Sequence, residues 1–138
     1  MAEGMLKQLL ETHGLQIEVT SAGTSAFDGM GASPETLSLL EEIGINMRDH
    51  QARRLNIPMI EEADLIFVME ETHENWILSR APEAKNKIYS LADFDPSFKY
   101  EGIGIPDPIG MGDSFYENVG ELIHNACEHI VEKLTQTA

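Results

Sequence analysis

The chain has 138 residues, of which 42% are hydrophobic and 24% charged, an ordinary globular composition with enough apolar residues for one core. Nine basic residues against 24 acidic ones give a formal net charge of −15, which argues against a nucleic-acid or anionic-membrane partner. No apolar run approaches membrane-spanning length, no secretion signal opens the chain, and a single cysteine excludes an internal disulfide. We therefore expect one soluble, cytoplasmic domain over residues 1–138.

The chain opens with a predicted helix and a predicted strand. Residues 1–12 place apolar side chains on one helical face, and Gly14 is a typical helix stop. This helix has no N-cap residue, because the chain begins inside its first turn. Residues 16–20 alternate apolar and polar side chains, which predicts a half-buried strand near a sheet edge. Residues 21–32 are rich in Gly, Ser and Ala and predict a loop.

Two further helices carry recognisable start signals. Ser33-Pro34 combines a cap residue with a first-turn proline, and the helix it begins should end at Gly44. Asn56 is a second candidate cap, with Pro58 in the first turn that follows.

The second half of the chain predicts two more strands. Residues 65–69 form a continuous apolar run, which is typical of a parallel strand covered on both faces. A helix through Trp76 follows and should break near Pro82. Residues 88–91 predict another strand, and residues 92–112 predict a long loop.

The final helix is the clearest element of the sequence. Its apolar residues recur at helical spacing and are Phe115, Val119, Leu122, Ile123, Ala126, Cys127, Ile130 and Leu134. Because Cys127 lies within this stripe, we expect a buried structural thiol and not a nucleophile.

Strands that alternate with helices predict an α/β domain with a parallel sheet flanked by helices. Only three strands are countable, however, and the first helix has no strand to cross over from. We therefore expect that a central strand and its loop are absent in front of Met1.

One loop and few other residues are candidates for chemistry. Asp107 lies between Pro106 and Pro108, and a stiff loop of this kind can hold a general acid or base, although a simple turn is the commoner role. His124 and its acidic neighbours should point away from Cys127, so we expect no metal site. No complete nucleotide-binding motif is present, and no cofactor is expected. Composition and spacing alone name no reaction.

Five short motifs in register add a resemblance. They are Met1-Ala2-Glu3-Gly4, Ser21-Ala22-Gly23-Thr24, Asp49-His50-Gln51-Ala52-Arg53, Ala63-Asp64-Leu65-Ile66 and Ile105-Pro106-Asp107-Pro108. Together they resemble the low-molecular-weight protein-tyrosine phosphatase family over essentially the whole chain. The resemblance implies a four-stranded parallel sheet flanked by helices.

The chain departs from that family in its phosphate loop, and in having Ile109 and Gly110 where family members often have aromatic residues after Asp-Pro. The family's phosphate loop, Cys-x5-Arg-Ser/Thr, would precede Met1 and is not among these residues. The resemblance implies that its cysteine attacks phosphorus and that Asp107 acts as general acid. It also makes Phe27 and Ile109 candidates for the substrate wall, although core packing is the more ordinary role of Phe27. The expected substrate is a phosphorylated protein or a small phosphomonoester.

Three interpretations remain open. The first is a phosphatase whose sequence starts at an internal Met and which is inactive as it stands. For this case we expect the codons upstream of Met1 to encode an apolar strand and Cys-x5-Arg-Ser/Thr in frame. The second is a catalytically dead interaction module. The third is arsenate reduction, which would need redox cysteines besides Cys127.

Overall fold

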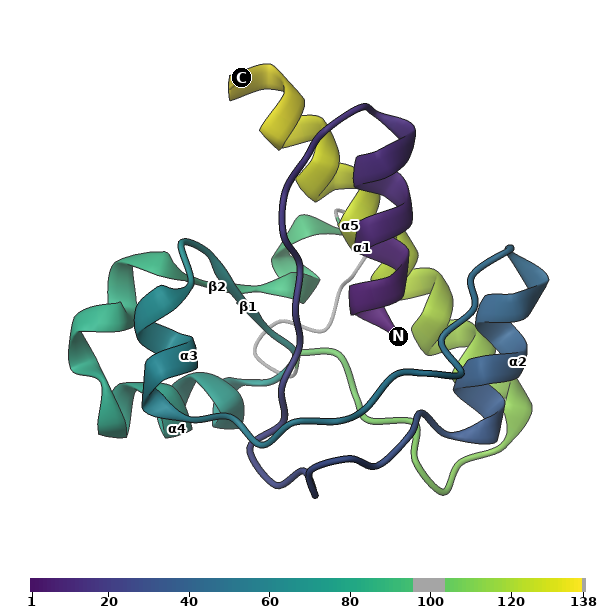
Figure 1. The fold of residues 1–138 in the computed structure, drawn as a ribbon, viewed down its shortest axis with the longest axis horizontal. Helices are drawn as coiled ribbons and strands as arrows, with labels where there is room; N and C mark the ends of the chain where they lie inside the picture. The colour runs from purple at the N-terminus through teal and green to yellow at the C-terminus, as the bar shows by residue number, and fades with distance from the viewer. Residues whose placement is uncertain (96–103, 138) are drawn as a thin grey trace.

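The computed structural model describes residues 1–95 and 104–137. Its helices and strands follow one another along the chain as shown in Figure 1. They are α1 (Ala2–Thr12), α2 (Pro34–Glu42), α3 (Ile57–Glu62), β1 (Ile66–Val68), α4 (Glu71–Arg80), the 3₁₀ helix η1 (Pro82–Lys87), β2 (Ile88–Ser90), the 3₁₀ helix η2 (Leu91–Phe94) and α5 (Asp113–Thr137).

The two strands form a parallel pair at the centre of the molecule. Ile66 lies opposite Ile88, Phe67 opposite Tyr89, and Val68 opposite Ser90. The α4 and η1 helices connect β1 to β2, so the pair is a strand–helix–strand unit. The predicted α/β class with parallel strands and flanking helices is therefore confirmed.

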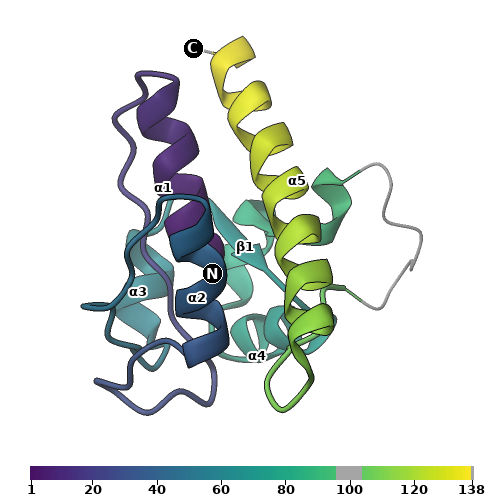
Figure 2. The same ribbon diagram turned by 90° about the vertical axis from the view of Figure 1, so that its right-hand side faces the viewer.

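The side chains of β1 alternate between two separate apolar clusters. Phe67 packs against a cluster that α1, α2, η2 and α5 build. Ile66 and Val68 belong to a second cluster, which includes Ile60 of α3 and Ile77 of α4. Figure 2 shows the long helices α1 and α5 close together, with α4 on the other side of the strands. Helices thus cover both faces of the strand pair, as the apolar run at residues 65–69 predicted.

The predicted helix starts are confirmed in detail. The Thr36 N–H donates to Ser33 Oγ at 3.3 Å, and the Met59 N–H donates to Asn56 Oδ1 at 3.0 Å. Each bond satisfies a backbone donor that the first turn of a helix leaves free. Helix α1 has no side-chain cap, also as predicted.

Helix α5 buries a slightly broader face than its sequence predicted. Val119, Ile123 and Cys127 are all buried, and so are two residues outside the predicted stripe, Tyr116 and Val131. Phe115, Leu122 and Leu134 are only half-buried. The stripe is wider because α1, α2 and η2 all pack against this helix. In the part of the chain that the structure describes, no helix is both long and apolar enough to span a membrane.

Residues 16–20 differ from the prediction of a strand. Within the described ranges, no backbone group of this segment makes a hydrogen bond. Ile17 is 47% exposed, and only Val19 of the segment is half-buried. The alternating pattern is present, but a strand also needs a neighbour to pair with. The nearest strand-like pairing is an isolated parallel bridge between Gly23 and Arg54.

Candidate functional site

The Asp107 loop lies beside the carboxyl end of β1. Ile105 is buried, and its N–H donates to Met69 O at 2.7 Å, which fixes the loop just beyond the strand. Asp107 itself is exposed, and its Oδ1 accepts the Ile109 N–H at 3.0 Å. In parallel α/β sheets, the carboxyl ends of the strands are where ligands usually bind. The loop therefore holds one carboxylate at the end of the sheet where a substrate would lie.

Gly104 allows this loop to pass close to the strand. Its φ is +76°, and a Cβ at this position would overlap Met69 O and crowd the backbone of Glu70. Only glycine combines that backbone angle with that approach. The geometry of the Asp107 loop therefore depends on a residue three positions earlier.

A polar network around Glu3 ties the first turn of α1 to two other segments. Ser21 Oγ donates to Glu3 Oε1 at 2.8 Å, while Lys7 Nζ and His50 Nδ1 lie 3.2 and 3.6 Å from Glu3 Oε2. Burial acts to raise the pKa of Glu3. The hydrogen bonds from Ser21 and Lys7, with the charges of Lys7 and His50, outweigh it and lower the pKa below its ordinary value. No local sequence pattern reveals this network, because Glu3, Ser21 and His50 are far apart along the chain.

The loop of residues 21–32 is held against residues 52–54 by backbone hydrogen bonds. The Gly29 N–H donates to Ala52 O at 2.9 Å, the Ala52 N–H donates to Met30 O at 2.6 Å, and the Gly23 N–H donates to Arg53 O at 2.9 Å. In Figures 1 and 2, this loop and residues 105–112 lie at the same end of the molecule. The N-terminal end of α1 points toward that end.

The two candidate wall residues are both exposed at the surface. Phe27 is 75% exposed and Ile109 is 72% exposed. The expectation that Phe27 packs in the core is therefore wrong, because its loop lies on the surface and turns the ring outward. Met30 and Met111, on the same two loops, are also exposed. These apolar side chains are available for contact with a ligand.

Cys127 is fully buried in the α5 interface. Burial raises the pKa of its thiol to about 12, against the smaller opposing effect of the N-terminal amino group. A thiol of this kind is protonated at neutral pH and has no access to a substrate. The prediction of a structural thiol agrees with this placement.

The described residues assemble no cluster of three or more His, Cys, Asp and Glu side chains that could hold a metal ion. His124 Nδ1 lies 3.2 Å from Glu128 Oε1 on the outer face of α5, one turn apart. Cys127 lies on the buried face of the same helix, so the three side chains do not converge.

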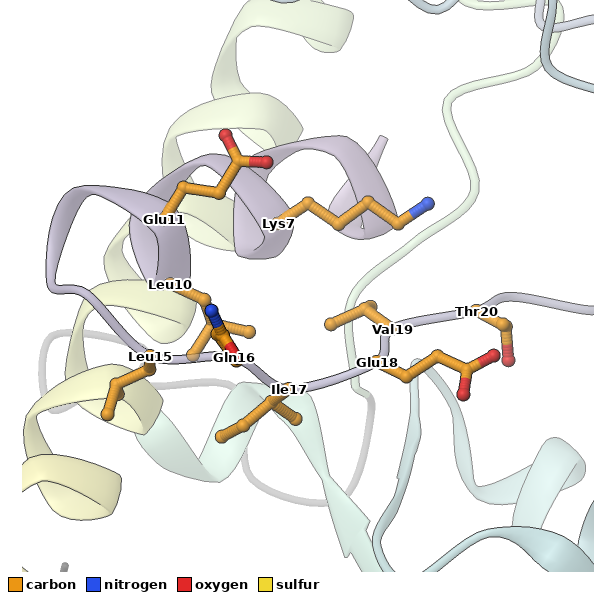
Figure 3. Close-up of a pocket in the computed structure, with 9 residues that line it drawn as sticks. All are labelled: Lys7, Leu10, Glu11, Leu15, Gln16, Ile17, Glu18, Val19 and Thr20. Atoms are coloured by element: carbon orange, nitrogen blue, oxygen red, sulfur yellow. The ribbon is translucent and has the colours of Figure 1, made fainter.

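A groove of about 620 Å³ lies between α1 and residues 15–20. Figure 3 shows Val19 pointing from the extended segment toward α1, while Ile17 points away from it. Lys7 and Glu11 of α1 lie across the groove. Because no residue of the Asp107 loop lines the groove, it is separate from the candidate site.

Comparison with known proteins gives a consistent result. The sequence profile of the family described as "Low molecular weight phosphotyrosine protein phosphatase" matches residues 1–138. The chain is 34% identical over 123 residues to the low molecular weight protein-tyrosine-phosphatase Ptp of Acinetobacter johnsonii, covering 89% of this chain and 80% of that protein. It is 27% identical over 128 residues to the phosphatase Wzb of Escherichia coli K12, covering 93% and 84%.

Solved structures show the same likeness. A protein tyrosine phosphatase from Entamoeba histolytica, with Hepes in its active site, superposes with a TM-score of 0.89 at 26% identity and covers 99% of this chain and 88% of that one. The YwlE arginine phosphatase from Geobacillus stearothermophilus superposes with a TM-score of 0.84 at 30% identity, covering 99% and 86%.

Proposed function

Because the chain belongs to the low molecular weight phosphotyrosine protein phosphatase family, we propose that it serves phosphomonoester hydrolysis with Asp107 as general acid. The observation that carries the proposal is the exposed Asp107 carboxylate, held by the Ile109 N–H at the carboxyl end of β1. A general acid has to be held within hydrogen-bond reach of the leaving oxygen. The prolines on either side of Asp107 limit the directions that its backbone can take.

Asp113, six residues further along the chain, suits the role less well. It lies in the first turn of α5. Gly112 O accepts the N–H groups of Phe115 and Tyr116 in the same turn. Unlike Asp107, Asp113 has no proline on either side to restrict the directions of its backbone.

The nucleophile is proposed to come from outside residues 1–138. These residues contain one cysteine, the buried Cys127, and no Cys-x5-Arg segment. A thiolate supplied by such a segment would attack phosphorus and form a P–S bond, and the P–O bond to the leaving group would break. Asp107 would give its proton to that leaving oxygen. Water would then attack the phosphocysteine and give its proton to the Asp107 carboxylate, releasing phosphate and the thiolate.

The proposed substrates are phosphorylated proteins, with phosphotyrosine as the first candidate. Phe27 and Ile109, exposed on two loops at one end of the molecule, would form an aromatic and an aliphatic wall for the substrate side chain. Phosphoarginine is the second candidate, because the YwlE phosphatase of G. stearothermophilus is described as an arginine phosphatase and shares 30% identity. Arsenate reduction is disfavoured, because the cysteine of this chain, Cys127, is buried. The competing interpretation is an interaction module without catalytic activity.

The test compares two proteins with an aryl phosphate as substrate. The chain of residues 1–138 should show no turnover above background, whereas the same chain joined to an upstream strand and Cys-x5-Arg loop should turn over. Cys127→Ser should leave both results unchanged, because that thiol is buried. Activity of the shorter chain that disappears in Cys127→Ser would contradict the proposed nucleophile. An inactive but folded longer chain would favour the interaction module.

A further inference from the structure

A pair of arginines stands out on this acidic molecule. The chain has nine Lys and Arg residues against 24 Asp and Glu residues, yet Arg53 and Arg54 are adjacent and both exposed. Neither side chain makes an ion pair with any residue that the structure describes. Two other arginines are engaged: Arg48 lies 2.7 Å from Glu41, and Arg80 lies over the Trp76 ring. Among the described residues, the Arg53–Arg54 pair is therefore a positive spot without a neutralising ion pair.

This pair lines a shallow pocket of about 370 Å³. Polar Gln51 and Asn56 and apolar Met59 contribute to the same pocket. The one acidic residue there is Asp28, and its Oδ1 already accepts the Arg54 N–H at 2.7 Å. The lining thus includes two arginines and one acidic residue, whose carboxylate already accepts a backbone N–H. The local charge is positive although the chain as a whole carries −15.

The backbone beneath the pair is held in place, and it is joined to the candidate site. Arg53 O accepts the Gly23 N–H, and the Leu55 N–H donates to Gly23 O, both at 2.9 Å. Gly29, which follows Phe27 and Asp28, is bonded to Ala52 of the same segment. The loop that carries the proposed Phe27 wall therefore also forms one side of the arginine pocket.

We propose that Arg53 and Arg54 dock a short acidic segment of a protein substrate beside its phosphorylated side chain. That this segment belongs to a substrate rests on the function proposed above. Guanidinium groups bind carboxylates through paired hydrogen bonds, and the apolar Met59 offers contact for the methylene groups of Glu. Nucleic acid fits less well, because a long polyanion meets the negative charge of the rest of the molecule. A short segment interacts mainly with the two arginines, because salt screens charges beyond about 8 Å at physiological ionic strength.

Binding of unphosphorylated peptides to the chain of residues 1–138 tests this inference directly. The probe is a fluorescent peptide with three consecutive Glu residues, and its twin carries Gln in their place. Fluorescence anisotropy measures the affinity, and amide NMR spectra locate the bound peptide. We expect the acidic peptide alone to bind and to shift the amides of residues 28–29 and 51–56.

A pair of double variants separates local contact from net charge. Arg53→Gln with Arg54→Gln should weaken binding about two- to thirtyfold, the range expected when two exposed ion pairs are lost. Arg48→Gln with Arg80→Gln changes the net charge by the same amount and should leave the affinity nearly unchanged. The amide spectrum of each variant shows directly whether it folds as the parent chain does.

Several results would overturn the proposal. They are equal weakening in both double variants, amide shifts away from the pocket, and no preference for Glu over Gln. Inorganic phosphate that produces the same shifts and displaces the peptide at lower concentration would show a small-anion pocket instead. None of these readouts involves turnover. A failure of Asp107 as general acid would therefore leave the peptide-binding result standing, and a failure of peptide binding would leave the role of Asp107 standing.

Discussion

Asp107 owes its direction to its immediate neighbours. The Ile109 N–H holds one carboxylate oxygen, and the buried Ile105 anchors the loop to Met69. The sequence could predict the residue, because Pro-Asp-Pro is a local pattern. It could not predict the hydrogen bond to Met69 O, which joins residues 36 positions apart in the chain. That long-range contact places the loop at the end of the strand.

The first prediction concerns Asp107→Asn in a chain that carries a Cys-x5-Arg loop. The amide keeps the size of the side chain and its oxygen acceptor but has no transferable proton. We expect kcat for phosphotyrosine-like substrates to fall about 10²- to 10⁴-fold. An aryl phosphate with a very acidic leaving group should lose less, because its oxygen departs readily as an anion. Steady-state kinetics on both substrates measure the difference.

Asp113→Asn is the matched control for that prediction. It changes a carboxylate in the first turn of α5 and should leave kcat nearly unchanged. A large effect of Asp113→Asn, together with small and equal effects of Asp107→Asn on both substrates, would show that Asp113 is the acid.

The second prediction concerns Glu3 and pH. Despite burial, the hydrogen bonds from Ser21 and Lys7 lower its pKa below the ordinary value of 4.5, so its charged form is favoured by folding. A carboxyl group with a lowered folded-state pKa stabilises the fold above its unfolded pKa, and that contribution disappears as pH falls through the folded pKa. Glu3→Gln should therefore be less stable than the parent near neutral pH, and the gap should close in acid.

Urea unfolding at a series of pH values measures this gap. Ser21→Ala removes one donor to Glu3 and should give a smaller loss with the same pH dependence. A gap between Glu3→Gln and the parent that widens as pH falls below 4.5 would contradict the assigned direction of the shift.

At the scale of elements, local signals predicted helices better than strands. Ser33 and Asn56 cap the helices that follow them, because a cap is decided within three residues. Residues 16–20 have the alternating pattern of a strand, but the structure gives their backbone no partner among the described residues. Pairing depends on a neighbouring segment, which a local pattern does not contain. The predicted loop at residues 92–112 begins instead with the short helix η2, and its residues 96–103 lie outside the described part.

The third prediction concerns Gly104→Ala at the start of the Asp107 loop. The methyl group would overlap Met69 O, and the φ of +76° is unfavourable for alanine. We expect a loss of about 1–3 kcal/mol in unfolding free energy from this strained position. In a chain with the phosphate loop, kcat should fall as well, because Asp107 moves with the loop.

Gly110→Ala provides the comparison for Gly104→Ala. Gly110 also has a positive φ, of +78°, but nothing lies within 4 Å of the position of its added Cβ. Its loss should therefore be smaller, since it lacks the overlap. Equal losses for the two variants in thermal or urea unfolding would show that backbone strain alone matters and that the close approach to Met69 does not.

At the scale of the whole molecule, apolar packing covers the strand pair on both faces but leaves one segment uncovered. Phe67 faces the α1–α5 cluster, and Val68 faces the α3–α4 cluster. Among the described residues, the backbone groups of residues 16–20 have no hydrogen-bond partner, and Ile17 is exposed beside the open groove of about 620 Å³. Unpaired extended backbone with exposed apolar side chains invites pairing with another chain.

The fourth prediction is that the chain of residues 1–138 self-associates through this segment. Sedimentation velocity should show a mass that rises with concentration, and Ile17→Lys should shift the distribution toward monomer, because a charge at an exposed edge disfavours pairing. Ile57→Lys is the matched control, since Ile57 is 44% exposed on α3 and the substitution adds the same charge. If both variants dissociate the chain equally, general repulsion and not edge pairing is the cause. A parent chain that stays monomeric at every concentration would contradict the prediction outright.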